Sequence, residues 1–408
     1  MNEPAKPTLA PGSLIVALLV AGLLCRLAYA FFTPTFYAPD EHSHYNYVRH
    51  LAEQRTYPVL TAKLGDPGDE WEYSQPPAYY ALLAPVYAFA RSVGGEAAVV
   101  RGLRVVSVGL WLVNVWLGFV LLRRMQITEP LTRVLVLGVV ALLPTYTFIS
   151  ATINNDNLLI TLGGAVLCLM AQRPPTWRTS LALGLVLGLA LLTKQSAVVF
   201  FPAIALLAIM DAAQKRISWP VAVRHLTLAL GLASLMFLPW ALRNWRLYHT
   251  LTPEYTTTPL LTWPSLPYGL ASALHNLAKT FWSVSGMTND VGYPFPLLGF
   301  AALAAWLVGH QNPAATARAV DGLNWKLNGA LFGAFLLALG FNLLLVLRFG
   351  YLFGMGQGRH LFPLLLPVAL LLAAGWRKLP VPALALSATI FWVVYAFGFA
   401  LFSLSRFP

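Results

Sequence analysis

Runs of about twenty apolar residues recur along this 408-residue chain and constrain its fold more than any other feature. A helix of that length spans the hydrocarbon core of a bilayer, which is about 30 Å thick. Hydrophobic residues make up 58% of the chain and charged residues 10%, whereas soluble domains carry about 25% charged residues. The sequence therefore predicts an all-α polytopic membrane protein. The predicted spans are 13–32, 102–122, 132–151, 155–172, 178–193, 196–213, 220–240, 294–310, 326–348, 360–376 and 380–402.

One further stretch, residues 76–93, is either a twelfth span or a helix that lies at the membrane surface. With eleven spans and a cytoplasmic N-terminus, the inside loops after residue 110 hold twelve Lys and Arg residues and the outer segments hold seven. A twelfth span would place seven of these residues inside and twelve outside. Because cytoplasmic loops are the ones enriched in Lys and Arg, eleven spans fit better. Pro85 and several tyrosines also suit an interfacial helix. We therefore predict about 11 transmembrane helices.

This topology gathers the polar segments on the outer side of the membrane. They include a first outer loop, residues 33–101, with juxtamembrane helices, and a long outer loop, residues 242–293. Residues 1–408 are expected to form a single transmembrane domain in the plasma (inner) membrane, without a separate soluble domain. The Lys and Arg behind the net charge of +12 are scattered between apolar runs. This pattern favours contact with anionic lipid or phosphate over nucleic acid.

The tract Ala38–His50 reads APDEHSHYNYVRH, and seven of the chain's 15 acidic residues lie between residues 33 and 76. Pro39 followed by two acids is typical of a helix start, and the expected helix runs to about Glu53. Asp40 and His44 would then share one helix face at i,i+4. A carboxylate beside an imidazole suits either a general base or a divalent-cation site. Alternatively, the acids cap the helix and the histidines are solvated.

Basic residues at the outer ends of predicted spans form a second set of candidates, namely Lys194, Arg243 and Arg359. Lys and Arg clamp phosphate oxygens through charge-assisted hydrogen bonds, so a lipid-linked phosphate is a natural ligand. The alternative is ordinary snorkelling to the membrane surface. Arg26, inside the first apolar run, either snorkels or faces an internal polar cavity.

Weaker candidates are a polar turn at residues 154–157 and the tyrosine-rich stretch that follows residue 72. In these segments Asn155, Asp156, Gln75, Tyr79 and Tyr80 can contact a hydroxylated acceptor or a sugar. The alternatives are a turn that only links two spans and tyrosines that sit at the membrane interface. Walker, nucleophile-elbow, HExxH and dinucleotide motifs are all absent from the sequence, which argues against a nucleotide-driven pump.

Taken in order, these motifs resemble the GT-C superfamily of integral-membrane glycosyltransferases, which includes aminoarabinose transferases and protein O-mannosyltransferases. The matching motifs are the acidic pair Asp40–Glu41 after one span, QPPAYY at 75–80, Arg101 and Arg104, NNDN at 154–157, TK at 193–194, PWALRN at 239–244 and GQGRH at 356–360. The resemblance implies a polyprenyl-phosphate sugar donor, an inverting transfer, and a lipid, glycan or protein acceptor on the outer face.

The resemblance also implies roles for individual residues. Asp40 would deprotonate the acceptor, with Glu41 as a second catalytic residue, while Lys194, Arg243 and Arg359 would stabilise the departing lipid phosphate. Glu41 or His44 would orient the acceptor. Alternatively, Asp40, Glu41 and His44 would hold a divalent cation, Mg²⁺ or Mn²⁺, because relatives differ in metal use.

Two other classes of function remain as alternatives. A lipid or sugar transporter would place its binding residues near the bilayer midplane, whereas the middles of the predicted spans contain almost no ionisable residues. A non-catalytic membrane scaffold with a GT-C-like body would use none of the candidate residues chemically.

Overall fold

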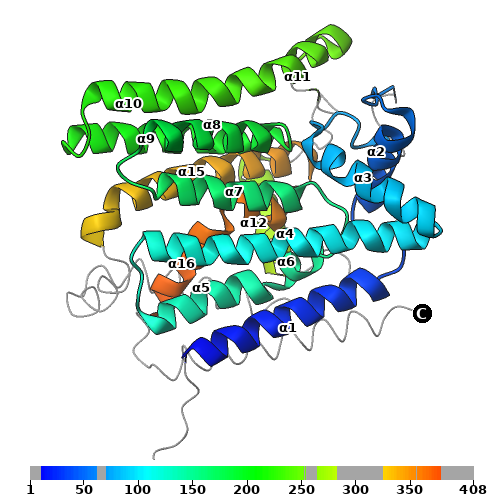
Figure 1. The fold of residues 1–408 in the computed structure, drawn as a ribbon, viewed down its shortest axis with the longest axis horizontal. Helices are drawn as coiled ribbons and strands as arrows, with labels where there is room; N and C mark the ends of the chain where they lie inside the picture. The colour runs from blue at the N-terminus through cyan, green and yellow to red at the C-terminus, as the bar shows by residue number, and fades with distance from the viewer. Residues whose placement is uncertain are drawn as a thin grey trace, which may run out of the picture.

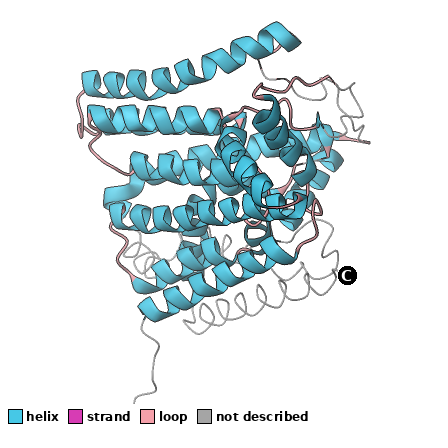
Figure 2. Ribbon diagram, turned by 45° about the vertical axis from the view of Figure 1, so that its right-hand side comes forward, coloured by secondary structure: helices cyan, strands magenta, loops and turns pink. Residues whose placement is uncertain are grey.

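The computed structural model describes residues 11–61, 70–251, 253, 264–282, 325–354 and 356–377, and every regular element in them is a helix (Figures 1 and 2). The predicted all-α class is therefore confirmed. The α-helices are α1 (Pro11–Phe32), α2 (Glu41–Gln54), α3 (Ala78–Val93), α4 (Glu96–Arg124), α5 (Pro130–Leu142), α6 (Pro144–Ile149), α7 (Asp156–Met170), α8 (Trp177–Leu191), α9 (Phe200–Ala213), α10 (Trp219–Leu226), α11 (Leu232–Tyr248), α12 (Leu266–Trp282), α15 (Trp325–Phe353) and α16 (Leu365–Arg377). Two 3₁₀ helices, η2 (Gln195–Val199) and η4 (Gly358–Leu364), and one π-helical turn, η3 (Thr227–Gly231), complete the set.

Apolar helices occur at nine of the eleven predicted spans. Six stretches are long and apolar enough to cross a membrane: Gly12–Phe32, Glu96–Arg124, Gln195–Ala213, Trp219–Tyr248, Asn328–Phe353 and Gly358–Trp376. Three shorter apolar helices, α5, α7 and α8, match three further spans. The predicted spans 294–310 and 380–402 lie outside the described residues, so the number eleven stays a prediction.

The segment predicted as the first outer loop, residues 33–101, contains two helices, α2 and α3. Helices α2 and α3 lie together at one end of the bundle, where α1 ends and α4 begins (Figure 1). Helix α3 has 16 residues, contains Pro85 and is not among the candidate spans; its position at the membrane surface stays a prediction. Within the predicted long outer loop, the described residues also form α12, which packs against α15 and η4.

A break between α5 and α6 explains a buried arginine in α1. Pro144 begins α6 and has no N–H group, so the carbonyl of Val140 loses its usual helical donor. Trp111 Nε1 donates to that carbonyl at 3.1 Å, and the Arg26 guanidinium donates to the carbonyls of Val140 and Ala141. Arg26 is fully buried and lies 4.0 Å from the centroid of the Trp111 ring. Snorkelling, one alternative for Arg26, is therefore wrong.

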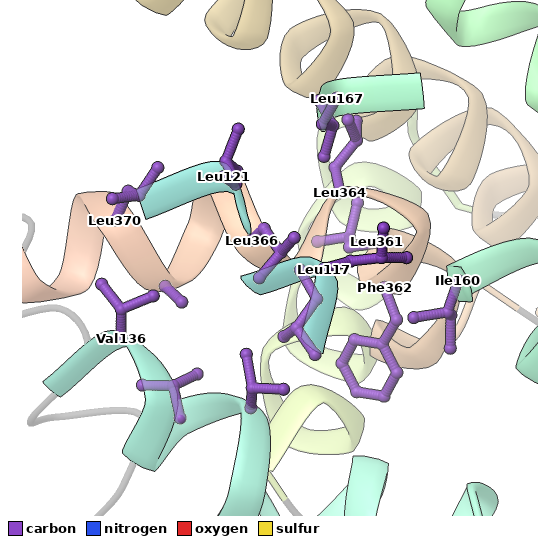
Figure 3. Close-up of a cluster of buried hydrophobic side chains, with 14 of the residues drawn as sticks. Leu117, Leu121, Val136, Ile160, Leu167, Leu361, Phe362, Leu364, Leu366 and Leu370 are labelled. Atoms are coloured by element: carbon purple, nitrogen blue, oxygen red, sulfur yellow. The ribbon is translucent and has the colours of Figure 1, made fainter. Parts of the chain in front are cut away.

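The main core brings η4 into the centre of the bundle. Figure 3 shows leucines and other apolar side chains of α4, α5, α7, η4 and α16 packed together. Gly163 of α7 permits the close approach of η4, because an added Cβ would lie 2.4 Å from the Pro363 carbonyl oxygen. This packing fixes the backbone of η4, which carries Arg359. The labelled side chains are Leu117, Leu121, Val136, Ile160, Leu167, Leu361, Phe362, Leu364, Leu366 and Leu370.

Candidate active site

Four charged side chains from distant segments form one chain of alternating sign. Arg359 Nη2 donates to Asp40 Oδ2 at 2.5 Å, and Lys194 Nζ donates to Asp156 Oδ1 at 2.6 Å. Arg359 Nε lies 4.0 Å from Asp156 Oδ2 and joins the two pairs. The structure thus brings together Asp40, predicted as catalytic, and Lys194 and Arg359, predicted to bind phosphate. Asp156, predicted only as a sugar contact, links the two cations.

Local backbone structure places the two carboxylates. Asp40 lies one residue before α2 rather than within its first turn, in the left-handed region at φ 62°, and its side chain makes no capping hydrogen bond. Asp tolerates this region better than most residues. Asp156 is the first residue of α7, where the helix dipole favours a carboxylate. Its backbone N–H donates to Asn154 Oδ1 at 2.9 Å, which orders the polar turn.

The four charged side chains of the site differ in exposure to solvent: two are partly exposed and two are buried. The side chains of Asp40 and Lys194 are 33% and 23% exposed, whereas those of Asp156 and Arg359 are 3% and 8% exposed. Burial, the largest single influence, raises the pKa of Asp40, but the charge of Arg359, its hydrogen bond and the charges of His44 and Lys194 together outweigh burial and lower that pKa below its usual range. The carboxylate is therefore ionised and its partial exposure lets a substrate group reach it, while the lowered pKa makes it a weaker base than a free aspartate.

Several buried polar atoms of this site have no protein partner. Arg359 Nε and Nη1 and Asp156 Oδ2 are buried without a hydrogen bond. Buried polar groups in folded proteins are almost always hydrogen-bonded, and each exception calls for an explanation such as a catalytic role or a bound water or ion. The two free donors of Arg359 are therefore available to an anion that enters the site.

Glu41, predicted as a second catalytic residue, has a different environment from its neighbour Asp40. Arg104 donates to both of its carboxylate oxygens, at 2.8 and 2.6 Å, and the backbone N–H of Ile153 donates to Oε1 at 3.1 Å. Both side chains of this ion pair are buried. Glu41 points into the protein because it begins α2, whereas Asp40 precedes the helix. These contacts attach α2 to α4, and the catalytic role expected of Glu41 stays a prediction.

His44 belongs to a buried cluster next to the charged chain. Its Nδ1 lies 3.0 Å from the Tyr80 hydroxyl, which donates to Glu72 Oε2 at 3.4 Å. Burial lowers the pKa of His44 to about 3 and raises the pKa of Glu72 to about 8, the latter with a further contribution from the charge of Asp40. Glu72 was not among the predicted site residues. The only sequence signal for it is its membership of the acidic cluster.

The remaining predicted acceptor contacts are largely internal. Tyr79 and Tyr80 are fully buried. Tyr79 accepts the backbone N–H of Asn154 at 2.9 Å, and the ring of Tyr80 stacks on Tyr47 at 3.7 Å between centroids. Neither ring is open to a sugar, because both hold α2, α3 and the polar turn together. Gln75 and Asn155 approach each other, with Asn155 Nδ2 donating to Gln75 Oε1 at 3.5 Å. Gln75 is half-buried and Asn155 buried.

Arg243, the third predicted phosphate ligand, is engaged elsewhere. Its Nη2 donates to the Pro58 carbonyl at 2.6 Å, and its guanidinium lies 4.5 Å from the centroid of the Trp240 ring. In the described part of the chain, no hydrogen bond or ion pair joins Arg243 to Asp40, Asp156, Lys194 or Arg359. These contacts attach the segment after α2 to the end of α11.

The residues predicted as metal ligands do not fit a metal ion. Both oxygens of Glu41 bind Arg104, His44 faces Tyr80, and Arg359 occupies Asp40 Oδ2. Across the described ranges, no group of three or more His, Cys, Asp and Glu side chains is arranged to hold a metal. The sequence interpretation of a site made by Asp40, Glu41 and His44 is therefore corrected.

Comparison with known proteins identifies the fold. No protein-family model matches the chain, and no curated protein sequence matches it significantly. Among solved structures, ArnT from Cupriavidus metallidurans in the apo state has a TM-score of 0.56 at 13% identity over 94% of this chain. The Archaeoglobus fulgidus oligosaccharyltransferase AglB, in complex with an inhibitory peptide and a dolichol-phosphate, has a TM-score of 0.59 at 11% identity over 96%. The chain has the GT-C fold. It spans 63% of the ArnT chain and 55% of the AglB chain.

Proposed function

We propose that this chain is an inverting glycosyltransferase that moves a sugar from a polyprenyl-phosphate donor to an acceptor on the outer face of the membrane. The observation that carries the proposal is the ion-pair chain, in which a partly exposed carboxylate, Asp40, shares a site with the cations Arg359 and Lys194. The GT-C fold supports it, as does the dolichol-phosphate bound by AglB, a protein of the same fold.

Asp40 is the general base in this proposal. Its Oδ2 is held by Arg359, so Oδ1 faces the acceptor and takes the proton from its hydroxyl or amine. The acceptor atom forms a bond to the anomeric carbon while the bond from that carbon to the phosphate oxygen breaks, and the electron pair leaves with the phosphate. A single displacement inverts the anomeric centre and needs no covalent intermediate. General-base catalysis of this kind contributes about 10²–10⁴-fold in rate.

Lys194 and Arg359 stabilise the departing phosphate. Charge grows on the phosphate as the bond breaks, and fixed cations aimed at that charge lower the barrier. Lys194 is the more exposed of the two, and Arg359 contributes the free donors Nε and Nη1. The attachment of Arg359 to the packed η4 holds these donors in place before the donor lipid binds.

The orientation in the membrane follows from the charge bias of the loops. The positive-inside rule places the N-terminus in the cytoplasm and α2 and α3 on the outer face of a plasma (inner) membrane. The grouping of α2 and α3 at one end of the bundle supports a one-sided site (Figure 1).

Replacing Asp40 with Asn tests the proposal, because the side chain keeps its size and loses its basicity. The purified Asp40→Asn protein should transfer sugar at least about 100-fold more slowly and still retain prenyl-phosphate lipid, as measured by native mass spectrometry. Glu96→Gln, at an exposed acidic position, is the matched control and should leave transfer unchanged. Unchanged transfer by Asp40→Asn would exclude Asp40 as the base, whereas a protein that transfers no sugar with or without the substitution would favour the transporter or the scaffold.

A further inference from the structure

An arginine occupies the space between the two carboxylates of the site. Arg359 Nη2 is 2.5 Å from Asp40 Oδ2, and Arg359 Nε is 4.0 Å from Asp156 Oδ2. A divalent cation that serves phosphate chemistry binds carboxylate oxygens at about 2.0–2.6 Å. The guanidinium thus holds the place where such a cation would meet Asp40 and Asp156.

This positive charge is built into the core of the protein. The Arg359 side chain is 8% exposed, and the neighbouring Phe362 and Leu364 of η4 are fully buried. The backbone N–H of Gly358 donates to Thr280 Oγ1 at 2.7 Å, which ties the start of η4 to α12. Arginine also keeps its charge at any physiological pH. The cation is therefore permanent and its position is fixed.

Several other potential ligands around this point are also occupied. Lys194 binds Asp156 Oδ1, Arg104 binds both oxygens of Glu41, and His44 Nδ1 faces the Tyr80 hydroxyl. Asp40 and Asp156 together carry two negative charges, which Arg359 and Lys194 balance. A divalent ion placed among them would meet two fixed positive charges and too few free oxygens.

We propose that sugar transfer by this chain needs no divalent metal, because Arg359, together with Lys194, supplies the positive charge that a metal ion would supply. This inference rests on the proposed function and specifies how that function is carried out. The proton passes to Asp40 and the electron pair leaves with the phosphate, which stays paired with Arg359 and Lys194. The step requires no further reactant.

Transfer by the metal-depleted protein is the first test. The full chain in detergent or nanodiscs is treated with EDTA, its metal content is measured by mass spectrometry, and sugar transfer is followed with and without added Mg²⁺ or Mn²⁺. The expected result is a rate that changes by less than about twofold. A loss of tenfold or more that Mn²⁺ or Mg²⁺ restores would overturn the inference and leave the proposed function standing. Absence of transfer under every condition would count against the proposed function itself.

Binding of Mn²⁺, followed by its EPR signal, gives a readout that does not depend on activity. The unaltered protein should have no Mn²⁺ site that depends on Asp40 or Asp156. Its EPR signal should therefore be the same as that of Asp40→Asn and of Asp156→Asn. Arg359→Ala frees Asp40 Oδ2 and removes the positive charge beside Asp156 Oδ2, so it should gain one Mn²⁺ site, which either Asn substitution then abolishes. Arg246→Ala removes an exposed arginine of α11 and is the matched control.

Two results would contradict the inference that Arg359 takes the place of a metal ion. One is Mn²⁺ binding by the unaltered protein that depends on Asp40. The other is a folded Arg359→Ala variant, verified by size-exclusion chromatography, that gains no site. If Arg359→Ala does not fold, the measurement on the unaltered protein still decides.

Discussion

The buried pair of Glu41 and Arg104 gives the sharpest test of how this site is assembled. All the donors of Arg104 are used: two bind Glu41, and the others donate to the carbonyls of Ala30, Thr33 and Pro34 at the end of α1. Glu41 directly follows Asp40 in the chain. A single ion pair therefore connects α1, α2 and α4 beside the reactive carboxylate.

Glu41 also accepts the backbone N–H of Ile153, three residues before Asp156. The pair thus holds both segments that carry the carboxylates contacted by Arg359. Breaking it should shift Asp40 relative to Asp156 and slow transfer even though neither Glu41 nor Arg104 touches the ion-pair chain.

The magnitude follows from the burial of the pair. Its side chains are 2% and 0% exposed, and removal of one partner from a buried ion pair costs about 3–5 kcal/mol, because the other charge is left without compensation. Glu41→Gln should lower the free energy of unfolding by that amount. For a chain of 408 residues each kcal/mol lowers the Tm by about 1 °C, so the expected fall is about 4–6 °C. The double variant Glu41→Gln, Arg104→Gln should recover part of the loss, since no buried charge remains unpaired.

The assay compares the two single variants and the double variant by thermal unfolding in detergent, followed by tryptophan fluorescence, and by sugar transfer. Glu96→Gln should change the free energy of unfolding by less than about 0.5 kcal/mol. One result would refute the reasoning: a Glu41→Gln protein with unchanged Tm that has lost transfer. Glu41 would then act in the reaction itself, as the sequence first suggested.

Three further outcomes are expected. First, Glu72 has a pKa of about 8, so above that pH it adds a third negative charge to those of Asp40 and Asp156. Transfer should therefore fall in alkaline buffer. Glu72→Gln should remove this fall from the pH–rate profile. Because the folded-state pKa of Glu72 is raised, its contribution to stability is complete below the unfolded pKa of 4.5 and is lost as the pH rises to about 8. Unfolding curves at about pH 4 and pH 9 measure this loss. Second, Lys194→Met should reduce transfer about 10–100-fold and weaken binding of prenyl phosphate, because a charge-assisted contact to the phosphate is lost; an unchanged KM and kcat would exclude Lys194 from the site. Third, Arg243→Ala should reduce kcat far less than Arg359→Ala does, since Arg243 binds a backbone carbonyl outside the ion-pair chain; equal losses would restore its predicted role as a phosphate ligand.

The sequence could predict the membrane class and the helix that follows Asp40, because both depend on local properties. Apolar length determines which segments suit a bilayer, and the helix after Asp40 ends at Gln54, one residue beyond the predicted Glu53. Contacts across long separations could not be predicted. Asp40 and Arg359 are 319 residues apart in sequence, and only the packing of η4 into the core brings them together. The predicted set nevertheless contained both residues.

Asp40 and Glu41 are adjacent in the sequence but have different environments. The sequence alone could not predict which of the two carboxylates faces the protein interior. Successive residues of a helix point about 100° apart, so the starting residue decides which carboxylate faces inward. The helix starts at Glu41, and Asp40 adopts a left-handed backbone conformation just before it. This places Glu41 against Arg104 and leaves Asp40 free to meet Arg359. The sequence pattern fits a start at either residue.

Arg26 bears on the choice between an enzyme and a transporter. An ionisable residue inside a transmembrane helix is by default a candidate for a transport pathway. Here its donors go to the carbonyls of Val140 and Ala141 and to Ser150 Oγ, and its guanidinium stacks on Trp111. The break at Pro144 explains why those carbonyls need a donor. Because the Arg26 charge is used to satisfy the carbonyls at the helix break, it gives no reason to assign a transport path there. The proposed chemistry is therefore assigned to the ion-pair chain.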